Sequence, residues 1–286
     1  MPHPAANEAA RSWLPTRLFS VLVSDAFYVP EGEWFTPMPW TRGPWDSEAQ
    51  HAGPPAALVA RAIEDLDPTG QLQIARFTLE ILRPIELTPL RIEARVVRPG
   101  KRVQLAQALL LDERGEVAIA NAWGIGRSDQ PVPAAGQEAP PFEPPLRSGL
   151  APTFDPPWDG ESYFTAMEWR VARGAFSEPG PAAVWMRSRI PLVAGEEPSP
   201  LARVLIVADS GNGISSVASP FEYLFINTEL TVHLFRQPVG EWVCLDAVSR
   251  IDRSGVGVAE SIIWDEVGRI GRGNQALLVA PRSERT

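Results

Sequence analysis

Extended segments with alternating apolar and polar residues dominate the first half of the chain. The alternation is clearest in Arg76-Phe-Thr-Leu-Glu-Ile-Leu and in Leu90-Arg-Ile-Glu-Ala-Arg-Val, and it is typical of half-buried strands. Turn sequences follow at Arg98-Pro-Gly-Lys101 and Asp112-Glu-Arg-Gly115. The pattern predicts an opening hairpin near 27–36 and then strands over about 73–84, 89–98, 103–111 and 117–126.

One segment of the first half has helical rather than extended periodicity. It starts at Ala52 and runs to about residue 65, with Pro54 and Pro55 in the expected first turn. Its apolar residues recur at helical spacing and would form one buried face; they are Ala57, Leu58, Ile63 and Leu66. We therefore predict a helix between the opening hairpin and the four strands.

The second half repeats this order of elements. Strands are predicted near 164–171 and 183–192, and a helix within 201–217 begins around Asp209. Four more strands are expected near 225–236, 241–250, 257–265 and 269–279. A long antiparallel sheet with one inserted helix, present twice, predicts the α+β class.

The two halves are also related residue by residue. Residues 94–115 align with 247–268 without a gap at a shift of 247 − 94 = 153. The matched identities are Val103 with Val256, Ala106 with Ala259, Asp112-Glu113 with Asp265-Glu266, Gly115 with Gly268 and Asn121 with Asn274. Solenoid repeats have periods of roughly 20–50 residues, so this repeat is a whole small domain that was duplicated and fused.

A proline-rich stretch lies between the two copies. Nine of the 27 residues from 131 to 157 are proline, a composition that disfavours helix and sheet and predicts a partly extended linker. We therefore divide the chain into an N-terminal repeat over 1–130, a linker over 131–157 and a C-terminal repeat over 158–286.

Composition and charge narrow the classes of partner. A net charge of −9 argues against a nucleic-acid or anionic-membrane surface, because such surfaces need clustered Lys and Arg. No apolar run approaches the ~20 residues of a membrane span, and the N-terminus lacks the features of a secretory signal. Cys244 is the single cysteine and there are three histidines, so we expect no disulfide, no metal site and a cytoplasmic location.

Five segments resemble those of a known family in order and spacing. They are His51-Ala-Gly-Pro-Pro-Ala-Ala-Leu-Val-Ala-Arg-Ala, Phe77-Thr-Leu-Glu-Ile-Leu-Arg-Pro, Ala208-Asp209, Thr228-Glu-Leu-Thr-Val-His-Leu-Phe-Arg-Gln-Pro and Gly268-Arg-Ile-Gly-Arg-Gly-Asn-Gln275. The chain resembles the acyl-CoA thioesterase II (TesB-like) group of the thioesterase superfamily. The resemblance implies a double hotdog, in which each repeat is a curled antiparallel sheet wrapped around a central helix.

The resemblance also implies a chemistry and the residues that perform it. Members of the group hydrolyse acyl thioesters with a water held by Asp, Thr or Ser, and Gln, which match Asp209, Thr228 and Gln275 here. A carboxylate can orient and deprotonate water, while a hydroxyl and an amide fix its line of attack. The implied substrate is acyl-CoA, no cofactor or metal is needed, and a homo-oligomer is possible because paired hotdogs often stack.

The oxyanion of the reaction needs hydrogen-bond donors as well. Backbone N–H groups of Ser210 and Gly211 would lie at the expected helix start. In the N-terminal repeat, Gly53 is the corresponding candidate donor, and Ala122 stands at the Gln275 position because 275 − 153 = 122. We therefore expect the C-terminal repeat to carry the water-positioning residues and the N-terminal repeat to be catalytically degenerate.

Two other classes of function stay open. Asp46 and His51, just before the first helix, resemble the Asp/His pair of hotdog enoyl-thioester hydratases, although a His in that place is also an ordinary capping residue. The chain could also be a non-catalytic acyl-thioester-binding module, since a family fold does not establish turnover. Each candidate residue has a structural reading too: Asp209 as a helix cap, and Thr228 as an ordinary strand residue.

Overall fold

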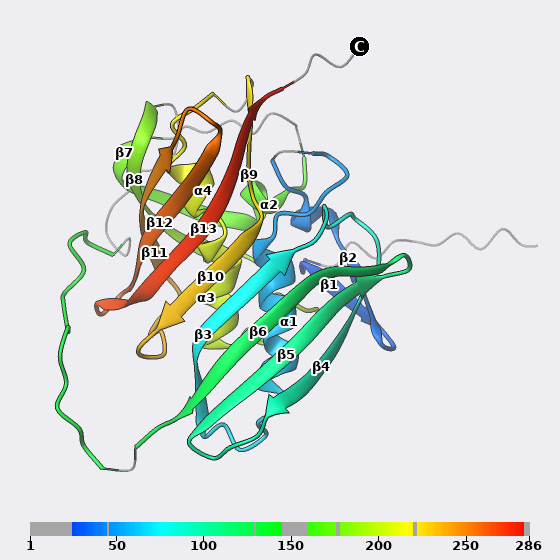
Figure 1. The fold of residues 1–286 in the computed structure, drawn as a ribbon, viewed down its shortest axis with the longest axis vertical. Coiled ribbons are helices and arrows are strands. Elements are labelled where there is room, and N and C mark those ends of the chain that lie inside the picture. Colours follow the sequence, from blue (N-terminus) through cyan, green and yellow to red (C-terminus); the bar gives the residue numbers. More distant parts are fainter. Residues whose placement is uncertain are drawn as a thin grey trace, which may run out of the picture.

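The computed structural model describes residues 25–44, 46–128, 130–144, 160–175, 178–219 and 222–282. Within these residues thirteen strands form a single antiparallel sheet, which curls around the helices (Figure 1). Twelve strands follow the order β1-β2-β4-β5-β6-β3-β10-β13-β12-β11-β8-β7, and β9 pairs with β13 beside this path. The predicted α+β class is confirmed.

The first half has the elements that its pattern predicts. They are β1 (Tyr28–Glu31), β2 (Trp34–Pro37), a 3-10 turn η1 (Pro39–Thr41), α1 (Gly53–Glu64), β3 (Leu72–Ile81), β4 (Leu90–Arg98), β5 (Val103–Asp112) and β6 (Gly115–Gly126). The opening hairpin, the helix and all four strands occur at the expected places. Of the predicted linker, residues 131–144 contain no helix or strand, and 145–157 lie outside the described residues.

The second half contains α2 (Tyr163–Ala166), β7 (Met167–Ala175), β8 (Glu178–Ser188), α3 (Pro200–Ala208), α4 (Gly211–Ile214), β9 (Tyr223–Asn227), β10 (Glu229–Leu234), β11 (Val243–Ile251), β12 (Val256–Asp265) and β13 (Arg269–Pro281). Three expectations are wrong in detail. Phe164 lies in a helical turn rather than a strand, the strand expected over 225–236 is broken at Thr228, and no helix begins at Asp209. Instead α3 begins at Pro200, where the Ser199 hydroxyl accepts the Ala202 N–H at 3.0 Å.

The repeat seen in the sequence is also present in the strands. The bounds of β11 and β12 are those of β4 and β5 shifted by 153 residues. An ion pair is repeated at the same shift: Arg83 binds Asp112 in the first half, and Arg236 binds Asp265 in the second. Both pairs hold the tight turn after the equivalent strands β5 and β12, so the duplication preserved this contact in both copies.

The two halves join through β3 and β10, the central strands of the sheet (Figure 1). Thr78 lies opposite Thr231 in this antiparallel pair, and these two residues are equivalent at the 153-residue shift. The Thr231 and Thr78 hydroxyl oxygens lie 3.3 Å apart, within hydrogen-bond distance. A contact between equivalent residues places a local two-fold axis between them, as at the isologous interface of a homodimer.

The helices lie inside the curled sheet and build the core from both halves (Figure 1). Helix α1 packs on β4 and β5, α3 packs on β8 and β11, and the two helices pack on each other. The short α4 packs on β11, β12 and β13. Every residue of α1 from Gly53 to Ala60 is buried, so its N-terminal part is enclosed and its polar backbone groups need partners within the protein.

The outer face of the C-terminal sheet carries a separate aromatic cluster. Trp185, Trp242 and Trp264 are buried there around Cys244, and Phe142 from the segment before the second repeat packs against them. The Arg269 N–H donates to the Glu138 carbonyl at 3.1 Å. Glu138 and Phe142 of the proline-rich segment are therefore held against the outside of the second half.

The Arg83–Asp112 pair gives a test of fold stability. Two hydrogen bonds from Arg83 lower the pKa of Asp112 from 3.8 to about 2. Breaking a fully buried pair costs roughly 3–5 kcal/mol; because Arg83 is partly exposed, we expect Arg83→Met to lower the free energy of unfolding by about 2 kcal/mol. Urea denaturation measures this, with Arg95→Met, at an exposed strand position, as the neutral control.

The same pair predicts a dependence on pH. A carboxyl whose pKa is depressed by folding stabilises the native state above its unfolded pKa and loses this contribution as pH falls through its native pKa. The difference between wild type and Arg83→Met should therefore be complete above pH 4 and shrink toward pH 2. A difference that stays constant over this range would contradict the assignment to Asp112.

Candidate active site

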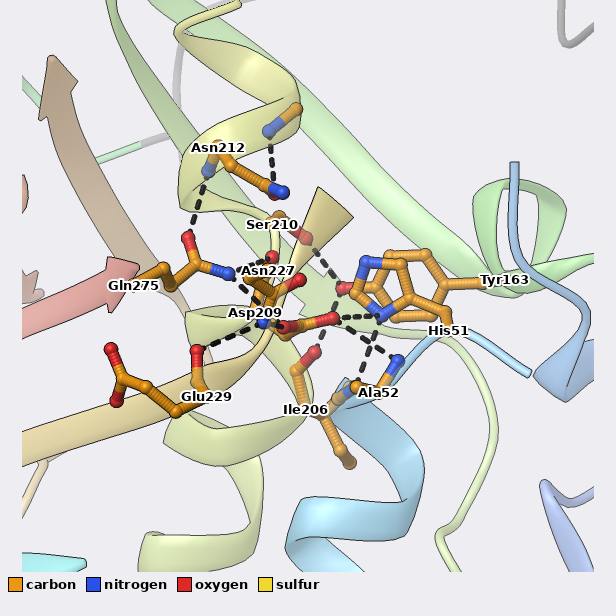
Figure 2. Close-up of polar contacts among 12 residues, drawn as sticks. His51, Ala52, Tyr163, Ile206, Asp209, Ser210, Asn212, Asn227, Glu229 and Gln275 are labelled. Carbon is orange, nitrogen blue, oxygen red and sulfur yellow. Dashed lines mark hydrogen bonds and ion pairs between the residues drawn. The ribbon is translucent and has the colours of Figure 1, made fainter. Parts of the chain in front are cut away.

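Four segments that are far apart in sequence meet where α3 ends (Figure 2). They are the turn after α3, the end of β9, the middle of β13 and the loop before α1. The first three belong to the C-terminal repeat and the fourth to the N-terminal repeat. Their polar groups converge on a single carboxylate, Asp209.

Asp209 is buried at the C-cap of α3. Its Oδ1 accepts hydrogen bonds from the Asn227 amide at 2.9 Å and the Gln275 amide at 3.1 Å. Its Oδ2 accepts the backbone N–H of Ala52 at 3.1 Å. Because a carboxylate has about four lone-pair positions and three are used, the remaining one is on Oδ2.

The Ala52 contact follows from the sequence of α1. The first turn of a helix has N–H groups without partners in the helix, and here Pro54 and Pro55 have no N–H to donate. Ala52 and Gly53 supply the remaining donors: Ala52 bonds Asp209, and the Gly53 N–H donates to His51 Nδ1 at 3.1 Å. A carboxylate of the second repeat thus caps the buried helix of the first.

Gln275 lies on β13 and is also buried. Besides bonding the Asp209 side chain, its amide donates to the Asp209 carbonyl at 3.0 Å, and its Oε1 accepts the Asn212 N–H at 2.9 Å. The structure therefore brings together two of the three residues that the resemblance implied, Asp209 and Gln275, while their catalytic role stays a prediction. At the equivalent position of the first repeat, Ala122 is fully buried and has no polar side chain.

Thr228 is not part of this cluster. It is exposed at the bend between β9 and β10, and among the described residues its side chain has no hydrogen bond; its N–H donates to the Ala276 carbonyl at 3.0 Å. Asn227 takes the position expected for Thr228. A one-residue shift moves a side chain to the opposite face of a strand, and the buried Phe225, two residues earlier, was the available signal for Asn227.

Asp46 and His51 are also not brought together. Asp46 is exposed and its carboxylate accepts the Glu48 N–H at 2.9 Å. His51 is buried, and its Nδ1 lies 3.4 Å from Asp209 Oδ2. The histidine of the first repeat therefore contacts the carboxylate of the second, and the Asp46–His51 pair required by the hydratase alternative does not form.

Tyr163 forms the wall behind His51, and sequence reasoning missed it. The two rings stack with centroids 3.7 Å apart and planes 4° from parallel (Figure 2). The Tyr163 hydroxyl donates to the Ile206 carbonyl at 2.8 Å and lies 2.9 Å from the Ser210 hydroxyl. Burial raises the pKa of Tyr163 and lowers that of His51, with Asp209 opposing the second shift, so His51 is neutral at pH 7.

The expected oxyanion donors differ in their availability. The Ser210 N–H donates to the Val207 carbonyl at 2.9 Å, and the Gly53 N–H is taken by His51. Gly211 lies against the sheet, where an added Cβ would be 3.0 Å from Gln275 Oε1 and 2.6 Å from Ser261 Oγ. Two of the three expected donors are therefore already used inside the protein.

Neither a metal centre nor a membrane span is found in the described parts of the chain. No group of three His, Cys, Asp or Glu side chains there is close enough to hold a metal ion. None of the helices there has both the length and the hydropathy needed to cross a bilayer.

Comparison with known families identifies the class. Residues 41–125 match the acyl-CoA thioesterase N-terminal domain, and residues 143–279 match the acyl-CoA thioesterase C-terminal domain. Together they cover most of the 286 residues. The chain belongs to the acyl-CoA thioesterase family, with one domain of each kind. A search of curated proteins finds no relative.

Solved structures agree on the fold. A Thermobifida fusca protein named as a candidate thioesterase II has a TM-score of 0.70 at 16% identity, covering 94% of this chain and 100% of its own. An Alicyclobacillus acidocaldarius protein with a hotdog fold has 0.69 at 16%, covering 91% and 98%. The acyl-CoA thioesterase II TesB2 of Mycobacterium marinum has 0.63 at 15%, covering 90% and 95%. The double-hotdog expectation is confirmed.

The close contact between α1 and α3 at Gly53 predicts that adding a methyl group there lowers stability. A Cβ on Gly53 would be 2.2 Å from the Ile206 carbonyl oxygen, so we expect Gly53→Ala to lower the free energy of unfolding by about 1–3 kcal/mol. Gly213→Ala is the matched control, because an added Cβ there meets nothing within 4 Å. Denaturant unfolding of both variants measures the difference; equal stabilities would contradict this close approach.

Proposed function

We propose that the chain is an acyl-CoA thioesterase that hydrolyses an acyl thioester to the free acid and CoA. The observation that carries this proposal is the convergence of Asp209, Asn227 and Gln275. It occurs in a chain whose two halves match the two domains of acyl-CoA thioesterases. The identity of the acyl group is left to experiment.

In the proposed mechanism Asp209 binds the attacking water through the free position on Oδ2. The carboxylate accepts the water proton while the water oxygen bonds the carbonyl carbon. The C–S bond then breaks, and the CoA sulfur leaves as a thiolate that is protonated on release. Because a thioester carbonyl is already activated, a positioned water can replace a covalent nucleophile.

Asn227 and Gln275 act by holding the carboxylate. Both donate to Oδ1, and Ala52 fixes Oδ2. An ionised carboxylate only accepts hydrogen bonds, and all three contacts are N–H donors. These contacts fix the orientation of the carboxylate that acts as the general base.

The asymmetry between the repeats supports one site rather than two. On the concave face of the second repeat, Gln275 and Ser261 are polar, while their equivalents Ala122 and Ala108 are buried alanines. The twelve-residue α1 packs on β4 and β5 of the first repeat, whereas the four-residue α4 packs on β11, β12 and β13 of the second. We infer that the N-terminal repeat contributes helix α1 and His51 to the site of its partner repeat.

The first test is Asp209→Asn, assayed by release of free thiol across a panel of acyl-CoA substrates. Loss of a general base lowers kcat by about 10²–10⁴-fold. Asp46→Asn, at an exposed position, should leave kcat unchanged. Wild-type rates in Asp209→Asn would refute the mechanism.

Other results of the same assay favour the alternatives. Wild-type protein that binds acyl-CoA but releases no thiol would be a binding module. A loss of activity confined to Asp46→Asn, with hydration of an enoyl-CoA, would favour the hydratase.

A second test separates two neighbouring residues. Asn227→Ala removes a donor to Asp209, and misplacing the base by ~1 Å costs about 10²-fold in kcat. Thr228→Ala changes an exposed side chain and should have wild-type kcat. The opposite ranking of the two variants would show that Thr228 holds the water after all.

A further inference from the structure

We propose that His51 is a further catalytic residue, whose Nε2–H donates to the thioester carbonyl oxygen and stabilises the negative charge that develops there. This inference rests on the proposed thioesterase activity. It gives the N-terminal repeat a direct part in chemistry that the general base of the C-terminal repeat starts.

The hydrogen bonds around the ring assign the proton to Nε2. The Gly53 N–H points at Nδ1 from 3.1 Å, so Nδ1 uses its lone pair as an acceptor. The 3.4 Å separation of Nδ1 from Asp209 Oδ2 is too long for a good hydrogen bond. A neutral imidazole that accepts at Nδ1 carries its hydrogen on Nε2.

Nε2 is also the accessible polar atom of a buried side chain. His51 is only 8% exposed. Among the described residues no hydrogen bond reaches its Nε2. This atom is nevertheless not fully enclosed, so it is accessible to solvent. An unpartnered donor that opens to solvent beside the proposed general base is placed to bind a substrate oxygen.

The ring is held rigidly in this orientation. One face lies parallel to Tyr163 at 3.7 Å, and the Tyr163 hydroxyl is tied to the Ile206 carbonyl. Ile206 belongs to α3, the helix that ends at Asp209. Tyr163, which holds the His51 ring, is thus anchored to the helix that leads into Asp209. Fixed donors stabilise a developing oxyanion without reorganisation.

Protonation also suits this role. Burial lowers the pKa of His51 despite the nearby Asp209, so the imidazole stays neutral and Nδ1 remains an acceptor at neutral pH. Two of the three expected backbone donors are engaged, because the N–H groups of Ser210 and Gly53 bond within the protein. The His51 Nε2–H is therefore a side-chain donor that stays available on the residue next to Asp209.

Two variants that carry a carboxamide on side chains of different length test the proposal. His51→Asn places an amide near Nδ1, where it can accept the Gly53 N–H, but leaves nothing at Nε2. His51→Gln reaches one bond further and restores an N–H donor near Nε2. We expect kcat per folded enzyme to fall about 10²–10³-fold in His51→Asn, with KM little changed, and to recover most of this loss in His51→Gln.

Any result other than a loss in His51→Asn with recovery in His51→Gln overturns the inference. Equal losses in both variants would assign His51 a role as a base or as a structural residue, since Gln cannot take up a proton. Wild-type kcat in both would remove His51 from the chemistry. Asp209→Asn, run alongside, keeps the two proposals apart: if it abolishes thiol release while both His51 variants stay active, the thioesterase proposal stands and this one fails.

Discussion

The structure depends on one hydrogen-bonded carboxylate that serves both halves of the chain. Pro54 and Pro55 remove two donors from the start of α1, and the Ala52 N–H that remains is buried and must be bonded. Asp209, from the other repeat, supplies the acceptor. The side chain that completes the central helix of the first repeat is therefore also the proposed base. The junction between the repeats and the proposed site therefore share this hydrogen bond.

Much of the fold could be predicted from the sequence, because strand alternation and turn residues act locally. β4 and β5 lie within a residue of their expected bounds, and the 153-residue repeat recurs in β11 and β12. The failures have non-local causes. Ser199 starts α3 well before Asp209, and the break at Thr228 depends on pairing with both β3 and β13.

For the candidate site, the sequence indicated which residue types would meet better than it indicated which residues would be their partners. Asp209 and Gln275 meet as expected, but their third partner is Asn227, one residue from the expected Thr228. His51 was a candidate, but its expected partner was the wrong carboxylate. The sequence pattern favoured Asp46 because it is close along the chain, whereas His51 contacts Asp209 of the other repeat. Tyr163 carried no signal, since its role depends on ring stacking in the folded protein.

The seam between Thr78 and Thr231 explains how such asymmetry could arise. In a dimer of identical subunits, one gene encodes both subunits, so every substitution occurs on both sides of the two-fold axis. A glutamine gained at one site is then also present at the symmetry-related site. Fusion uncouples the two sides. Gln275 could persist while its counterpart became Ala122, and the two repeats were free to supply different residues to one site.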